Sequence, residues 1–111
     1  MEPTLAPYLN FGNTAEAMRF YGSVFGRDLT MQTFGEAKMA QTPEMSDLVV
    51  HAVLKSGAIS LMASDRHPKE PAEVGDSVHM SIMGKDGTKL TKVFRELAAG
   101  GEIDMHLAKQ F

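Results

Sequence analysis

The sequence has no cysteine among its 111 residues. This absence excludes disulfides, zinc–thiolate sites and thiol nucleophiles. The sequence also lacks any apolar run near the roughly 20 residues that a membrane-spanning helix requires, and its N-terminus lacks the basic and apolar segments of a secretory signal peptide. No basic run stands out and the net charge is −3, so we expect neither nucleic acid nor a membrane as a partner. These absences favour a soluble protein of the cytoplasm.

The remaining composition is typical of a globular protein, with 43% hydrophobic and 23% charged residues. The length predicts one domain over residues 1–111. A domain of this size buries enough surface for one hydrophobic core.

A strand–helix–strand pattern begins the chain. The first strand signal is Pro7–Phe11, and its apolar side, which starts at Leu5, is expected to lie under a helix. Asn13 and Glu16 form a capping-box-like pair at the start of that helix, and Gly26 suits its end. The predicted apolar stripe of the helix is Ala17, Phe20, Tyr21, Val24 and Phe25. Three more strands are predicted at Leu29–Phe34, Val49–Lys55 and Ala58–Ser64, the last two joined by a turn at Ser56 and Gly57.

The same pattern recurs in the second half of the chain. Alternation predicts a strand at Ser77–Met83, and a helix follows that either Asp86 or Thr88 can cap. Its apolar stripe is Leu90, Val93, Phe94 and Leu97. Another strand is predicted at Glu102–Gln110, where the sequence ends one residue later. The two halves therefore form a weak internal repeat whose second copy is shorter than the first.

A polar side of the predicted sheet lies opposite the helices. It is expected to carry Tyr8, Asn10, Ser60, Met62, Ser64, His79, Ser81, Asp104 and His106. Such a face can simply be solvated, as in many antiparallel sheets, or it can line a ligand cavity. Met83 is a further pocket candidate beside Met62, because the flexible methionine side chain adapts to ligands of different shape. Met80 and Met105 fall on the helix side, where they are expected to pack in the core.

Acid–base chemistry is a weaker interpretation of the same residues. Asp104 and His106 point to one side of a strand, and with His79 they could act as a general acid and base. Solvent-facing strand residues explain them more simply. His51 can lie on either face of the sheet, and the loop motif Asp65–His67 is not specific.

Several segments together resemble one known family. Pro7–Phe11, Phe20-Tyr21 and Val24–Gly26 resemble the opening of the PhnB-like branch of the vicinal oxygen chelate superfamily, which includes glyoxalase I, bleomycin-resistance proteins and extradiol dioxygenases. The resemblance implies an α+β fold of paired βαβββ modules with a curled mixed sheet around a cavity. The first module would span residues 1–66 and a partial second module residues 77–111, without its last two strands.

The resemblance also implies where a divalent metal would bind. Metal-dependent members take ligands from the first, fourth, fifth and eighth strands, and these positions correspond to Ala6, Ser60, His79 and a segment beyond Phe111. Of the three positions within this sequence, only His79 has a side chain that can bind a metal. Catalytic metal sites use at least three protein ligands. The resemblance therefore implies no cofactor other than one candidate, a divalent metal at His79.

Three functions follow as expectations. The leading hypothesis is a small-molecule-binding protein without a competent metal centre, with pocket candidates Tyr8, Asn10, Ser60, Met62, His79, Ser81, Met83 and His106. The alternatives are a metal-dependent lyase, isomerase or dioxygenase-like enzyme whose site a partner chain completes, and a shortened non-catalytic remnant. Unpaired strand edges predict a homodimer or higher oligomer that forms through sheet edges.

Overall fold

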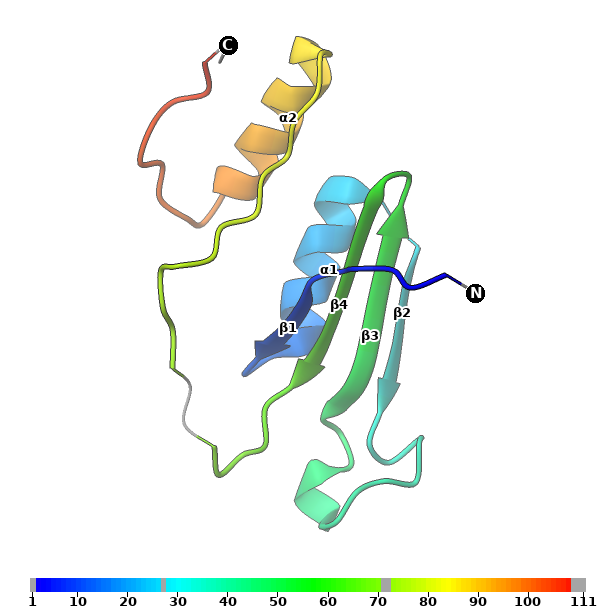
Figure 1. The fold of residues 1–111 in the computed structure, drawn as a ribbon. Helices are drawn as coiled ribbons and strands as arrows, with labels where there is room; N and C mark the ends of the chain where they lie inside the picture. The colour runs from blue at the N-terminus through cyan, green and yellow to red at the C-terminus, as the bar shows by residue number, and fades with distance from the viewer. Residues whose placement is uncertain (1, 27, 71–72, 109–111) are drawn as a thin grey trace. The chain divides into compact units, whose positions relative to one another are not determined.

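Two units make up the chain, Met1–Glu73 and Val74–Phe111. The computed structural model describes residues 2–26, 28–70 and 73–108, and Figure 1 shows the course of the chain. Within the described residues, no helix combines the length and the apolar character needed to cross a bilayer. Each unit is described in turn.

The first unit contains a mixed four-stranded sheet. Its strands are β1 (Tyr8–Phe11), β2 (Leu29–Thr33), β3 (Val49–Ser56) and β4 (Ile59–Asp65). Their order across the sheet is β1-β4-β3-β2. β1 runs parallel to β4, and the other neighbours are antiparallel. The sheet is open, and with its helix it confirms the α+β class and the layout of a single βαβββ module.

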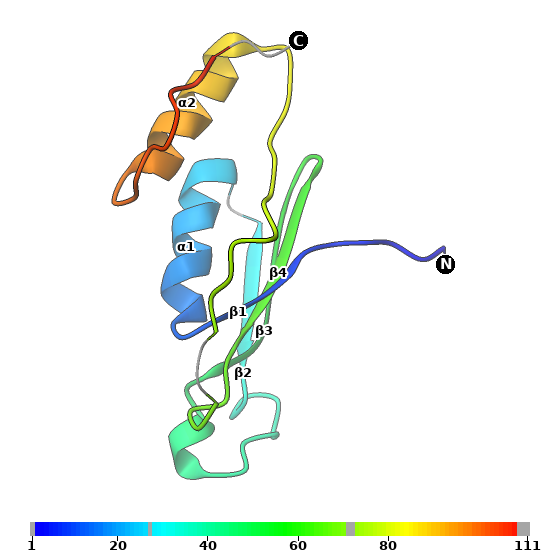
Figure 2. The same ribbon diagram turned by 60° about the vertical axis from the view of Figure 1, so that its left-hand side comes forward.

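Helix α1 (Thr14–Phe25) covers one face of this sheet, as the edge-on view in Figure 2 shows. The predicted cap is present: the Asn13 side chain accepts a hydrogen bond from the Glu16 N–H at 3.3 Å and donates one to the Glu16 carboxylate at 2.7 Å. After the helix, Gly26 takes a φ of +142°, a backbone conformation that favours glycine. The start and the end of α1 were therefore predictable from local sequence.

The core lies between α1 and the sheet. Its buried side chains are Met18, Val49, Ala52, Leu54, Leu61 and Ala63. Tyr21 and Phe25 of the predicted stripe pack against this core, but α1 also buries Met18 and Gly22, which the stripe omitted, and Phe20 is 36% exposed. Gly22 lies against Leu29 and Leu54. The stripe prediction counted large apolar residues and overlooked that a glycine brings the helix backbone onto the sheet.

Asp65 ties three elements of the first unit together. One of its carboxylate oxygens accepts the N–H of Thr14, at the first turn of α1, at 2.8 Å. The other accepts the N–H of Val49, at the start of β3, at 2.7 Å. Both bonds are part-buried and the carboxylate sits at the positive end of the helix dipole. A residue at the end of β4 thereby fixes the helix against the sheet.

The first strand is shorter than predicted. It begins at Tyr8, and Leu5, which was expected on the helix side, is fully exposed. Residues 2–7 have no strand assignment, although the Pro7 oxygen still accepts a hydrogen bond from the Met62 N–H. Pro7 explains the boundary, because it has no N–H to contribute to a ladder.

The second unit contains helix α2 (Gly87–Ala98) and extended chain on either side of it. Asp86 caps the helix by accepting from the N–H groups of Thr88 and Lys89, both at 3.1 Å. This settles the choice of cap in favour of Asp86. None of the residues of α2 is buried, although its apolar stripe was correctly predicted as a helical pattern.

The two strands predicted in this unit are not formed among its described residues. Ser77–Met83 and residues 102–108 have no strand assignment, and Lys109 and Gln110 lie outside the described residues. Side chains along them remain exposed, including Val78 (86%), Met83 (83%) and Met105 (77%). Alternation of apolar and polar residues makes a segment compatible with a strand, but a strand also needs a neighbour for its backbone N–H and C=O groups.

Candidate functional site

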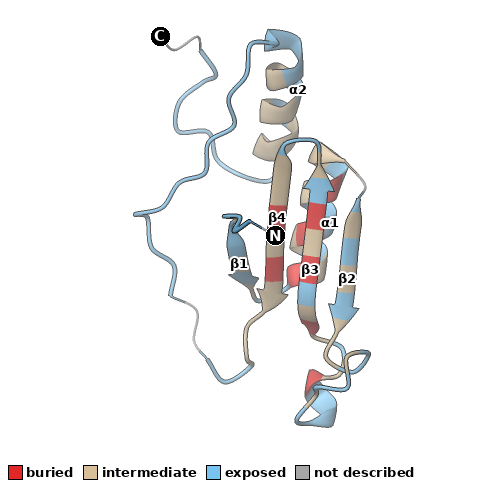
Figure 3. Cartoon of the chain, turned by 45° about the vertical axis from the view of Figure 1, so that its right-hand side comes forward, coloured by how far each residue is buried: buried red, intermediate tan, exposed pale blue. Residues whose placement is uncertain are grey.

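The face of the sheet opposite α1 is open, and Figure 3 looks onto it. Strand register gives the side chains on this face in rows. One row contains Tyr8, Met62, Val53 and Thr30. The next row contains Asn10, Ser64, His51 and Gln32. We call this surface the open face and use these rows to locate its chemistry.

Two aromatic rings meet over the middle of the open face. Tyr8 on β1 and His51 on β3 have ring centroids 6.0 Å apart with planes 29° from parallel. Because β4 lies between their strands, the two backbones are about 10 Å apart. The rings therefore lean toward each other across β4. This ring pair spans β4, and Tyr8 is 47% exposed to solvent.

A polar cluster adjoins the ring pair at the end of β1. The Ser64 hydroxyl donates to the Asn10 side-chain oxygen at 3.1 Å. The Nε–H of Arg66 donates to the backbone oxygen of Asn10 at 3.2 Å. Asn10 is thus held from two sides, by a strand neighbour and by a residue just beyond β4. The polar cluster consists of Asn10, Ser64 and Arg66.

The four pocket candidates in the first unit share this face. Tyr8 and Asn10 lie on β1 and are exposed, and Ser60 and Met62 lie on β4 and are partly buried. Register places Tyr8 directly beside Met62, whereas Ser60 lies two residues further along β4, opposite Lys55. The alternating pattern therefore assigned these four residues to one surface.

The other candidates lie in the second unit. His79, Ser81, Met83 and His106 are all exposed in extended segments. The His79 ring nitrogen Nε2 lies 3.0 Å from the backbone oxygen of Asp76, a local contact within three residues. That these side chains line a pocket stays a prediction, and Asp104 is exposed at a bend of the chain.

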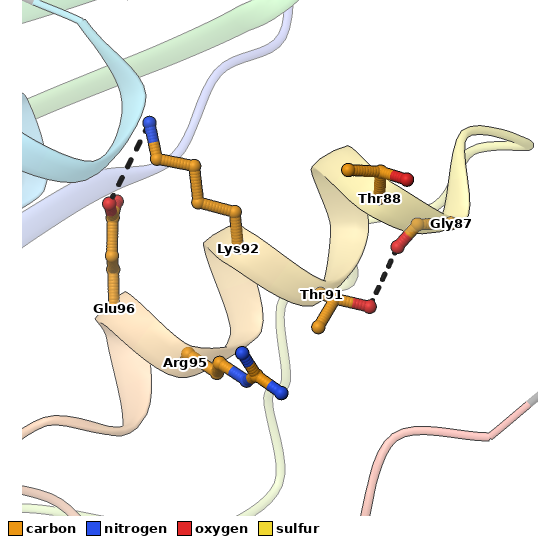
Figure 4. A pocket seen from close by; sticks show the side chains of 6 residues that line it. All are labelled: Gly87, Thr88, Thr91, Lys92, Arg95 and Glu96. Atoms are coloured by element: carbon orange, nitrogen blue, oxygen red, sulfur yellow. Dashed lines mark hydrogen bonds and ion pairs between the residues drawn. The ribbon is translucent and has the colours of Figure 1, made fainter.

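Two shallow surface hollows lie on helices rather than on the open face. One follows the side of α2 lined by Gly87, Thr88, Thr91, Lys92, Arg95 and Glu96 (Figure 4). It contains a Thr91–Gly87 hydrogen bond at 2.7 Å and a Lys92–Glu96 ion pair at 3.9 Å. The other lies on the outer side of α1, beside Phe20 and Tyr21. The first is lined by α2 alone and the second by α1 and its cap Asn13, so neither surrounds a ligand.

The residues present do not fit a catalytic metal centre. Ala6 offers only a methyl group and Ser60 a neutral hydroxyl, and His51 on the open face stacks with Tyr8 and lies beside Gln32. In residues 2–26, 28–70 and 73–108, no three histidine, aspartate or glutamate side chains come together as metal ligands. Neither Ala6 nor Ser60 supplies a carboxylate or an imidazole that could bind a metal. We therefore assign no chemical step to a metal.

Two residues of the open face were missed as site candidates. His51 was left undecided between the faces, and it is exposed whereas its neighbour Ala52 is buried in the core. Arg66 was set aside as part of a nonspecific motif. No local signal identifies it, because its contact with Asn10 joins residues 56 positions apart.

Comparison with known proteins supplies the remaining context. The profile of the Glyoxalase/Bleomycin resistance protein/Dioxygenase superfamily matches residues 4–111. Protein PA1353 from Pseudomonas aeruginosa, known from a crystal structure, is 33% identical, with a TM-score of 0.83 over 98% of this chain and 82% of its own. A putative 3-demethylubiquinone-9 3-methyltransferase, the PhnB protein from Bacillus cereus, is 21% identical, with a TM-score of 0.65 over 86% of this chain and 74% of its own. The second likeness concerns the fold alone. No curated protein matches the sequence.

Proposed function

Because the chain belongs to the glyoxalase/bleomycin resistance protein/dioxygenase superfamily, we propose that it binds a small organic molecule on the open face of its sheet, without a catalytic metal. Ala6 and Ser60 stand where metal-dependent relatives are expected to carry ligands, which supports the metal-independent form of the proposal. The ligand would lie on the ring pair and receive hydrogen bonds from the polar cluster.

The ring pair is the observation that carries this proposal. Tyr8 and His51 come from strands that are not neighbours, yet their centroids are 6.0 Å apart. The pair offers a planar ligand a surface on which its ring can stack. Stacked aromatic pairs contribute about 0.5–1.5 kcal/mol beyond their buried area. Met62 and Val53 extend this surface with apolar side chains in the same row.

A titration of the protein with small planar probes, followed by amide NMR shifts, tests the proposal. We expect benzamide and related ring compounds to shift the amides of β1, β3 and β4, with Tyr8→Ala and His51→Ala each weakening binding about three- to tenfold. The Phe20→Ala variant is the matched control, because Phe20 is a partly exposed ring on α1. Dialysis against a chelator should leave the affinity unchanged.

Two results would contradict this function. In one, no planar probe shifts the amides of the open face. In the other, Phe20→Ala weakens binding as much as the ring-pair variants, which would move the ligand to α1. A loss of binding after chelation would contradict only the metal-independent form.

We further propose that two copies associate through the edge of β1. Met62 N–H bonds to the Pro7 oxygen and Arg66 N–H to the Phe11 oxygen, so these β1 residues face β4. Strand alternation then turns the backbone groups of Tyr8 and Asn10 toward the outer edge. Apart from the Asn10 oxygen bound by Arg66, these groups have no hydrogen-bond partner among the described residues. Such an edge pairs readily with another strand.

Substitution by proline separates edge pairing from other modes of association. Asn10→Pro removes an outward N–H without removing a bond to β4, so we expect light scattering to detect a monomer. Asn10→Ala keeps the N–H and should remain a dimer. A wild-type monomer, or equal effects of the two variants, would contradict association through this edge.

A further inference from the structure

The guanidinium group of Arg66 is held by one hydrogen bond and has no ionic partner among the described residues. Its Nε–H donates to the Asn10 backbone oxygen at 3.2 Å, which orients the planar group. Among the described residues, the one ion pair that forms is Lys92–Glu96, on α2. The Arg66 terminal nitrogens therefore keep the two parallel donors that suit a carboxylate or a phosphate. A positioned arginine without a counter-ion is a recognition group for anions.

The neighbouring acid does not neutralise this charge. Asp65 precedes Arg66 in sequence, but its two oxygens accept from the backbone N–H groups of Thr14 and Val49 at 2.8 and 2.7 Å. Adjacent residues in a strand point to opposite faces. The Asp65 carboxylate thus lies on the helix side of the sheet, whereas the Arg66 guanidinium contacts β1.

A second donor lies on the residue that anchors Arg66. The side-chain oxygen of Asn10 accepts from the Ser64 hydroxyl at 3.1 Å, so the Asn10 amide NH₂ group faces away from Ser64. This NH₂ group has no partner among the described residues. Asn10 therefore presents a neutral donor, its NH₂ group, and also holds the cationic donor Arg66. Both donors adjoin the ring pair, because Asn10 follows Tyr8 by two positions on the same face of β1.

We propose that the polar cluster is an anion subsite, and that the ligand of the open face is a small aromatic acid. Its ring would stack on Tyr8 and His51, and its carboxylate or phosphate oxygens would accept from Arg66 and Asn10. This inference rests on the proposed function, and it adds the ligand's charge. The two acid types share the same oxyanion chemistry and differ in charge and shape.

A pair of matched ligands isolates the charge. Benzoate and benzamide have the same ring and nearly the same size, and only benzoate is an anion. We expect wild-type protein to bind benzoate more tightly, with a preference that falls as salt is added, because the cluster is partly exposed. In Arg66→Gln, benzoate affinity should fall about tenfold or more while benzamide affinity stays nearly constant, as expected for loss of a charge-assisted hydrogen bond.

Three controls make the result specific. Arg19→Gln removes the same charge from an exposed position on α1 and should leave both affinities unchanged. Arg66→Lys keeps the charge but loses the planar fork, and should give an intermediate benzoate affinity. The benzoate-to-benzamide ratio within one variant cancels any general loss of folded protein. If Arg66→Gln does not fold, the benzoate-to-benzamide affinity ratio of Arg66→Lys decides whether Arg66 binds the anion.

The outcomes distinguish this inference from the proposed function. Benzamide binding to the open face with an unchanged ratio in Arg66→Gln would overturn the anion subsite and leave the proposed function standing. An equal effect of Arg19→Gln would also overturn it. Failure of both ligands to shift the open face overturns both proposals. Titrations with phenyl phosphate and inorganic phosphate identify the acid: tighter binding of phenyl phosphate than benzoate indicates a phosphate ester, and the reverse indicates a carboxylate.

Discussion

The two units of this chain begin with similar sequence patterns and end with different degrees of burial. In the first unit, α1 and four strands enclose a core in which Met18, Ala52, Leu54 and Ala63 are fully buried. In the second, α2 has no buried residue and the flanking segments are extended without strand pairing among the described residues. Both helices have a side-chain cap and an apolar stripe.

This difference separates local from non-local causes of structure. A capped amphipathic segment can form helical hydrogen bonds by itself, because each bond joins residues four apart. A strand cannot, because its bonding groups point to neighbours. In the first unit, β1 pairs with β4, which lies more than fifty residues later in the sequence. The second unit has the patterns of strands without the neighbours, so its apolar side chains stay exposed.

Truncation of one methionine in each unit tests this contrast with the largest expected effect. Met18 is fully buried in the core, and Met105 is 77% exposed. Met18→Ala should lower the free energy of unfolding by about 2–5 kcal/mol, because it leaves a cavity. Met105→Ala should change it by less than about 0.5 kcal/mol. Denaturant unfolding measures both.

Concentration dependence sharpens the methionine comparison. If Met105→Ala costs nearly as much as Met18→Ala, and the cost grows with protein concentration, then a second copy covers the second unit. That result would contradict the contrast in burial between the units. Equal and small effects of both variants would instead show that the core is not closed around Met18.

Two aspartates provide the next comparison. Asp65 accepts two part-buried backbone hydrogen bonds, and Asp104 is exposed. Asp65→Ala should cost about 2–4 kcal/mol, because charge-assisted bonds are lost and two backbone donors lose their partner. Asp104→Ala should be nearly neutral. Thermal unfolding of the two variants measures the difference, and equal melting temperatures would show that Asp65 does not hold α1 to the sheet.

Glycine substitutions are expected to have effects of opposite sign in the two units. At Gly26, φ is +142° and an added Cβ would lie 2.5 Å from the Ser56 hydroxyl oxygen, so Gly26→Ala should cost about 1–3 kcal/mol. At Gly87, no heavy atom lies within 4 Å of an added Cβ. Because Gly87 is the first residue of α2, Gly87→Ala should stabilise the helix by only about 0.2–0.5 kcal/mol, less than in a helix interior. Circular dichroism during thermal unfolding reports both, and destabilisation by Gly87→Ala would show that α2 is covered.

Much of the first unit could be predicted because its signals are local. The Asn13–Glu16 cap and the turn after β3 depend on residues within a few positions of one another, and the turn lies at Gly57 and Ala58, one residue later than predicted. Alternation along β1 and β4 also assigned Tyr8 and Met62 to one face. The same reasoning was wrong for Ser77–Met83 and residues 102–108, because it cannot detect whether a neighbouring strand exists.

The unpredicted parts of the candidate site depend on tertiary structure. His51 follows Val49 and Val50 in a continuous apolar run, and the register between β2 and β3 shifts at Thr33, so alternation alone could not choose its face. Arg66 reaches Asn10 only because β1 and β4 pair in parallel. The sequence therefore indicated the surface on which a ligand would bind, whereas the ring pair and the placement of the arginine required the fold.

The smallest expected effect tests whether α2 relies on local interactions. Lys92 and Glu96 form an i,i+4 pair at 3.9 Å, with side chains 76% and 37% exposed, and such pairs contribute about 0.3–0.5 kcal/mol. In a helix without buried residues, this contribution should be visible: Lys92→Gln should speed amide hydrogen exchange in α2 about twofold, and added salt should abolish the difference. Lys89→Gln, on the same helix but outside the ion pair, is the control and should change exchange less. If neither substitution alters exchange while α2 amides are as protected as those of α1, then packing rather than local bonding holds α2, and the contrast between the units disappears.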